Sequence, residues 1–249
     1  HNTPQLFILN TIVKDGIIVA NININFDNQG KIKDNYQIKG LVKNVRVDIL
    51  NKSRIKDLNF SFDIIKNKYS LNELSAIFNK IKISAPLIQI KEKDNLYSID
   101  GNISNKNQKL EGKDLEPIFG NLFDSSDIKK IELSSTNNFS FTIDKKLRFN
   151  NLVLETNINL DQLTFIKKNL NLEPFLLNTK EEIKLENHKI KINYNKDQLA
   201  IDGRGDIFLT DNIEKLSYNV AKNSDQFLFN TKLNIKNNSL IMDFLDYKK

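Results

Sequence analysis

The sequence predicts a mainly β protein, in which a long, curved, meandering antiparallel sheet forms an apolar-lined groove with one or two short helices. Three observations support this fold class. Apolar and polar residues alternate along most of the chain, which is the period of an extended strand. Turn residues recur about every ten residues, as in an antiparallel meander. No linker rich in Pro, Gly or Ser interrupts residues 1–249, so we expect one continuous segment.

The clearest strand covers residues 58–64. Its apolar residues share one parity, and only polar residues occupy the other: Leu58, Phe60, Phe62 and Ile64. A helix would scatter these four side chains around its circumference. The pattern therefore predicts a strand with one apolar face and one solvated face.

A similar strand is expected earlier in the chain, between turns at Asp15-Gly16 and at residues 27–30. Its even positions are apolar and face three asparagines: Ile18, Ala20, Ile22, Ile24 and Phe26. Residues 36–49 continue the alternation but change phase near Lys43-Asn44. Such a change indicates a bend, a bulge or a short turn.

Four or five short strands are expected between residues 69 and 103, followed by a break in the alternation at residues 114–123. Apolar residues there are spaced i, i+3, i+4 and i+7: Leu115, Ile118, Phe119 and Leu122. Asp114 can cap a helix and Pro117 suits a first turn. We predict a short helix, most simply a connector packed on the core, with a lid or an end plug as the functional alternatives.

The second half of the chain predicts further strands around Phe139 and Phe141 and at residues 152–160, 183–194, 199–201, 207–209, 216–220, 227–235 and 240–244. Residues 161–172 fit either a second amphipathic helix or two short strands. Gly203-Arg204-Gly205 reads as a bulge or tight bend between strands. The full count is about sixteen to eighteen strands.

Little in the composition indicates catalysis. The chain has no Cys and two His, and His188 lies between expected strands, where a turn or surface position is the simplest interpretation. The other histidine, His1, is at the end of the sequence, so His188 has no second His or Cys with which to build a metal site or a catalytic dyad, and we expect neither metal nor cofactor. Glu73 and Glu181-Glu182 are best explained as solvated residues. We expect a protein that is not an enzyme, and a carbohydrate-active enzyme with an acidic pair is kept as the remote alternative.

The charge pattern also limits the partners. The formal net charge is +6 and the isoelectric point is about 9.2, but lysines alternate with carboxylates and form no basic stripe. Nucleic-acid binding is therefore not expected. The apolar runs are far shorter than the ~20 residues of a membrane span. Because the chain begins at His1 rather than Met, we expect a piece of a larger protein with an anchor upstream.

Four segments of the last third carry a family resemblance: residues 196–207, 213–220, 227–235 and 242–247. Together with residues 81–101 and the helix expected at 114–123, they resemble the AsmA-like envelope proteins, in the YhdP-like branch. The resemblance implies a periplasmic β groove, anchored in the inner membrane of a Gram-negative bacterium, that conducts phospholipids between the two membranes. It implies possible envelope partner proteins and no catalytic residues.

If that function applies, apolar residues of one parity contact phospholipid acyl chains. The expected lining residues are Ile18, Ile22, Ile24, Phe26, Leu58, Phe60, Phe62, Ile64, Phe139, Phe141, Ile190, Ile192, Phe227, Phe229, Leu233, Ile235 and Met242. The alternative is a structural or adhesive β solenoid or sandwich without lipid cargo, in which the same residues pack against one another.

Overall fold

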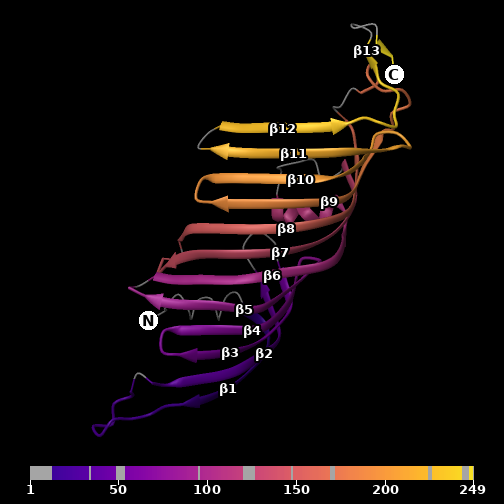
Figure 1. Cartoon of the computed structure of the whole chain (residues 1–249). Helices are drawn as coiled ribbons and strands as arrows, with labels where there is room; N and C mark the ends of the chain where they lie inside the picture. The colour runs from indigo at the N-terminus through magenta and orange to yellow at the C-terminus, as the bar shows by residue number, and fades with distance from the viewer. Residues whose placement is uncertain are drawn as a thin grey trace. The chain divides into compact units, whose positions relative to one another are not determined.

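The computed structural model confirms a mainly β protein. It describes residues 13–33, 35–48, 54–94, 96–119, 127–146, 148–168, 172–223, 226–242 and 247–248. Within these residues, twelve strands form one antiparallel sheet in which every strand pairs with its neighbours in the sequence, and the sheet is not closed (Figure 1). A separate pair of short strands, β13 and β14, follows.

The strands of the large sheet are 9 to 18 residues long. In chain order they are β1 (Val13–Asn23), β2 (Gln37–Asp48), β3 (Arg54–Ile65), β4 (Lys68–Phe78), β5 (Ile81–Lys93), β6 (Leu96–Leu110), β7 (Ile128–Asp144), β8 (Phe149–Ile166), β9 (Glu182–Asn195), β10 (Gln198–Phe208), β11 (Ile213–Asn223) and β12 (Gln226–Asn234). Helix α2 (Gly112–Phe119) separates β6 from β7, and β13 (Ile241–Met242) pairs with β14 (Tyr247–Lys248).

The chain divides into two compact units. Unit 1 comprises residues up to Asn105 together with Thr136–Glu155, and unit 2 comprises Lys106–Ser135 together with Thr156–Lys249. Strands β1 to β5 belong to unit 1, whereas β9 to β12 and α2 belong to unit 2. Strands β6, β7 and β8 each contribute residues to both units.

The described strands are fewer and longer than predicted because bulges interrupt the alternation without ending a strand. Asn44, Glu73 and Asn187 lie inside strands with φ angles of 53°, 53° and 54°. The pairing register shifts beside each of them. A bulge adds one residue to one strand and reverses which parity faces which side. In β4 this joins two segments that the sequence pattern separates, 69–71 and 74–78.

The helical interpretation of residues 161–172 is wrong for the residues that the structure describes. Residues 161–166 complete strand β8, and the backbone N–H of Lys167 still donates to the carbonyl of Glu181, at 3.0 Å. Phe165 packs against buried residues of unit 2. The neighbouring β9 supplies ladder partners and Phe165 has a buried contact, so tertiary context overrides a helical spacing that is weak by itself.

The helix predicted at residues 114–123 is present as α2, which begins two residues earlier. Asp114 does not cap it. Its carboxylate instead accepts a hydrogen bond from the N–H of Glu111, at 3.0 Å. This is the contact that the third helical residue (N3) makes in a capping box. Figure 1 draws α2 behind β8 and β9. Residues 120–123 of the predicted helix lie outside the described residues.

Unit 2 contains the one cluster of large buried side chains in the described part of the chain. Leu176, Ile183, Ile207 and Leu209 are buried. Partly buried residues from the strands and from the segments that follow β8 and β12 surround them: Phe165, Leu172, Leu185, Leu216, Ile235 and Leu240. The bridge between Leu176 and Leu240 joins the two segments. Protein thus covers the strand ends at this point of the sheet.

Candidate functional site

Unit 1 carries a face on which apolar side chains line up from strand to strand. Residues directly opposite in neighbouring strands project to the same side of a sheet. The pairing registers of the strands therefore define cross-strand rows. One row is Ile22, Ile38, Ile64, Tyr69, Ile90 and Ile99. The next is Ala20, Gly40, Phe62, Leu71, Ile88 and Gly101. We call this side of β1 to β6 the unit 1 apolar face.

The opposite side of the same strands is polar. Between the two apolar rows in the sequence lies a polar row: Asn21, Lys39, Asp63, Ser70, Gln89 and Asp100. Lys39 Nζ lies 3.4 Å from Asp63, and Gln37 Nε2 donates to the same carboxylate at 3.1 Å. Alternation along each strand and alignment across strands thus give two faces of different chemistry.

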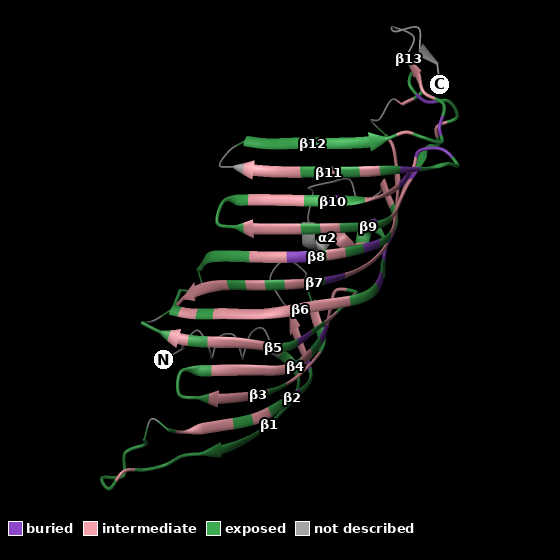
Figure 2. Ribbon diagram, viewed as in Figure 1, coloured by how far each residue is buried: buried purple, intermediate pink, exposed green. Residues whose placement is uncertain are grey.

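The unit 1 apolar face is only partly withdrawn from solvent. Among the described apolar residues of unit 1, Val42, Val45, Ala76 and Ala85 are buried. The large side chains of the face, Phe62 included, remain partly exposed, as the pink strands of Figure 2 show. A second layer of protein would bury such residues, because packed cores exclude solvent from side chains of this size.

Two glycines let aromatic rings lie flat on this face. A Cβ added at Gly40 would lie 2.5 Å from Cζ of Phe62, and one at Gly101 would lie 3.0 Å from Cζ of Phe139. Phe139 therefore belongs to the same face. Phe141 stacks beside it, with ring centroids 5.8 Å apart, and Phe149 follows with its centroid 4.9 Å from that of Phe141.

Unit 2 repeats the pattern on β9 to β12. One row contains Ile192, Ile201, Val220 and Phe229. The next contains Ile190, Gly203, Tyr218 and Thr231. We call this side the unit 2 apolar face. The ring of Tyr218 covers Gly203, where an added Cβ would lie 2.1 Å from Cζ of the tyrosine.

His188 lies in the middle of strand β9 and is 1% exposed, so the turn or surface interpretation is wrong. The bulge at Asn187 precedes it, and Gly205 leaves room for the ring: a Cβ there would lie 2.2 Å from Cδ2 of His188. Nε2 lies 3.0 Å from the carbonyl oxygen of Asp206 and donates to it in the neutral ring. Burial lowers the pKa of His188. Gly203-Arg204-Gly205 continues strand β10 and makes space for two rings.

The edge strands expose the most apolar surface. All nine residues of β12 are exposed, with Phe229 at 72%, and the described side chains of β1 are exposed as well. Among the described strands, each of these two has a hydrogen-bonded neighbour on one side only. Ile18, Ile22, Phe227 and Phe229 thus lie at the open margins of the sheet.

The remaining predicted lining residues divide into two groups. Phe60 pairs with Val42 and Leu58 with Val45, beside the unit 1 rows, and Leu233 pairs with Leu216 in unit 2. Four others lie elsewhere. Ile24 and Phe26 follow β1 in a hairpin closed by the bridge from Phe26 to Ile32, Ile235 packs on the buried cluster of unit 2, and Met242 lies in β13. Sequence reasoning missed Tyr69, Ile88 and Tyr218, whose alignment depends on the register.

Nothing in the described residues assembles a metal site, since no group of three or more His, Asp and Glu side chains gathers there. Glu73 and Glu182 are exposed. Among the described helices none is long and apolar enough to cross a membrane. A scan against family models and searches of curated proteins and of solved structures found no match to this chain.

Proposed function

We propose that the chain is a segment of a periplasmic bridge, anchored in the inner membrane, that carries phospholipids to or from the outer membrane along the apolar side of its sheet, without catalysis. One observation supports the proposal above all: the apolar rows of unit 1 cross six neighbouring strands and remain partly exposed. Exposed apolar surface of this extent is typical of a surface that binds another apolar molecule.

The dimensions of the face suit an acyl chain. Six strands spaced ~4.8 Å apart span ~24 Å, and each methylene withdrawn from water contributes ~0.8 kcal/mol. The rows offer the same apolar chemistry from one strand to the next. An acyl chain that moves along them therefore loses one contact as it gains another. An open face that offers equivalent contacts from strand to strand therefore favours movement of the lipid over tight retention.

A structural or adhesive scaffold without lipid cargo is the second candidate. Strands β1 and β12, which are exposed and lie at the two edges of the sheet formed by the described residues, favour it, because strand edges with apolar side chains pair readily with other strands. In that function the apolar rows are covered by another protein layer instead of acyl chains. The two candidates therefore differ in what occupies the unit 1 apolar face.

Native mass spectrometry of the chain purified from a Gram-negative host, with lipid extraction, separates the candidates. The matched variants are Phe60→Asp and Ser61→Asp, which place the same charge on opposite faces of β3. Co-purified phospholipid that persists in Ser61→Asp and is lost in Phe60→Asp supports lipid transport. A chain that carries no lipid and takes up no fluorescent phospholipid from vesicles contradicts it, provided that circular dichroism shows a folded sheet.

A further inference from the structure

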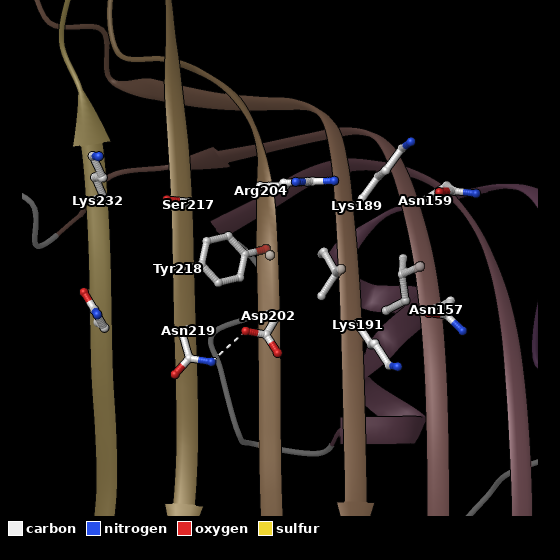
Figure 3. Close-up of a pocket in the computed structure, with 14 residues that line it drawn as sticks. Asn157, Asn159, Lys189, Lys191, Asp202, Arg204, Ser217, Tyr218, Asn219 and Lys232 are labelled. Carbon is white, nitrogen blue, oxygen red and sulfur yellow. Dashed lines mark hydrogen bonds between the residues drawn. The ribbon is translucent and has the colours of Figure 1, made fainter.

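The polar side of unit 2 carries a row of cations that the apolar side does not explain. Lys189, Arg204, Ser217 and Lys232 lie directly opposite one another on β9, β10, β11 and β12. All four residues are exposed. Figure 3 shows them in a line across the four strands, separated by the level of Tyr218 from a second line that includes Asp202 and Asn219. We call Lys189, Arg204 and Lys232 the basic row.

The members of the basic row lack the carboxylate partners that other cations of the chain have. The chain contains four arginines, and three of them pair with aspartates: Arg46 with Asp15, Arg54 with Asp48 and Arg148 with Asp144. In the part of the chain that the structure describes, neither Arg204 nor Lys189 nor Lys232 forms an ion pair. A guanidinium presents a planar fork that suits two oxygens of one anion.

Two hollows flank the basic row, and their own carboxylates are already engaged. The larger, of about 650 Å³, contains Asp202, which accepts from Asn219 Nδ2 at 2.7 Å. The other, of about 500 Å³, contains Asp206, which pairs with Lys215 and accepts from Asn187. The hydrogen bond from Lys215 lowers the pKa of Asp206. Each hollow is lined by four cationic residues and one acid, so positive charge exceeds negative charge around the basic row.

The arrangement has a cost when no ligand is bound. Lys189 and Arg204 are direct cross-strand partners, and like charges at such positions destabilise a sheet. An anion between them converts this repulsion into two attractive contacts. The Ser217 hydroxyl lies in the same row and can donate to the same anion. Four asparagine amides line the larger hollow and can bond hydroxyl groups: Asn157, Asn159, Asn219 and Asn230.

We propose that the basic row and the larger hollow bind a phosphate group carried by a hydroxylated molecule, such as a sugar phosphate or a glycerol phosphate. Arg204 takes two phosphate oxygens, Lys189 and Lys232 supply further charge, and the amides bind hydroxyls. This site is built on side chains of the basic row, which project to the side of the sheet opposite the unit 2 apolar face, although Ile190, Gly203 and Tyr218 of that face also border the larger hollow. It therefore does not depend on lipid transport.

The test uses the chain labelled with ¹⁵N-arginine, in which the Nε–H signals of only four arginines appear. Glucose 6-phosphate, glycerol 3-phosphate, inorganic phosphate and unphosphorylated glucose are titrated separately at low salt. A saturable shift of the Arg204 signal with a phosphate compound, and none with glucose, supports the site. Vesicles containing phosphatidylglycerol form a separate arm, so that a response to vesicles alone assigns the phosphate to a lipid headgroup.

Variants test whether the basic row is responsible for binding the phosphate compounds. Arg204→Gln and Lys189→Gln should each weaken binding about tenfold, whereas Lys196→Gln, in the exposed turn between β9 and β10, should leave it within twofold. Isothermal titration calorimetry measures all three on chains that circular dichroism shows to be folded. The proposal is overturned if no phosphate compound or vesicle shifts the Arg204 signal, or if Lys196→Gln weakens binding as much as Arg204→Gln.

Discussion

Replacing Glu214 should destabilise unit 2 more than replacing any exposed carboxylate. Glu214 is 2% exposed, and its carboxylate holds the turn that follows β12. Oε1 accepts from the N–H groups of Asn237 and Asn238 at 2.7 and 2.8 Å and from Asn238 Nδ2 at 2.9 Å, while Oε2 accepts from the N–H of Lys236 at 2.7 Å.

The magnitude follows from these four hydrogen bonds. Glu214→Ala removes every acceptor and leaves the N–H of the buried Asn238 without one. A hydrogen bond to a charged group contributes ~1.5–3 kcal/mol, and an orphaned buried donor costs ~1–3 kcal/mol. Because the lost bonds share one side chain and the turn can rearrange, we expect a loss of ~3–5 kcal/mol in the free energy of unfolding. Glu214→Gln keeps one oxygen and should lose ~2 kcal/mol.

Urea denaturation followed by circular dichroism and by a fluorophore attached near residue 236 measures both variants. Glu182→Gln is the control, because Glu182 is an exposed carboxylate of unit 2 that directly precedes Ile183 of the buried cluster, and it should change stability by less than ~0.5 kcal/mol. A loss below ~1 kcal/mol for Glu214→Ala would refute the role given to the carboxylate, since the turn would then hold its shape without it.

Three further predictions concern unit 2. Gly205→Ala should cost ~2 kcal/mol in urea denaturation, because its Cβ would lie 2.2 Å from Cδ2 of His188 and overpacking costs ~1–3 kcal/mol; an equal loss in a His188→Ala background would exclude that contact as the cause. Burial lowers the pKa of His188. As pH falls below ~6.5, His188 therefore becomes protonated in the unfolded chain while it stays neutral in the folded chain. Stability should decline from pH 7 to pH 5 in the native chain and less in His188→Gln. Burial alone raises the pKa of Glu214, but its hydrogen bonds outweigh that effect and lower it. The stability that Glu214 contributes should therefore be present above the ordinary Glu pKa of ~4.3 and be lost as pH falls through its lower folded value, and Glu214→Gln should show a shallower decline below pH 5.

The sequence predicts strands well because alternation is a local property. The parity of Leu58, Phe60, Phe62 and Ile64 survives in β3, and the registers place the last three on the unit 1 apolar face beside residues of β2 and β4. The alternation predicts too many short strands because a residue in the left-handed region, such as Glu73 in β4, shifts its phase. In the sequence pattern such a shift resembles a strand end.

Features that depend on register could not be read from the sequence. Lys189, Arg204 and Lys232 are separated by 15 and 28 positions and meet only because β9 to β12 pair as they do. The burial of His188 has the same origin, since the space for its ring comes from Gly205 on the neighbouring strand. Two glycines facing ring-bearing residues on adjacent strands are the signal that could have indicated it.

Photo-crosslinking from one strand tests the central proposal most directly. Benzoylphenylalanine is placed at Phe62, on the unit 1 apolar face, or at Ser61, on the other side of β3, and the chain is irradiated with radiolabelled phospholipid vesicles. The account predicts that phospholipid is linked at position 62 and not at position 61. Equal labelling at both positions, or labelling at neither by a folded chain, would contradict the proposal that the apolar face holds acyl chains.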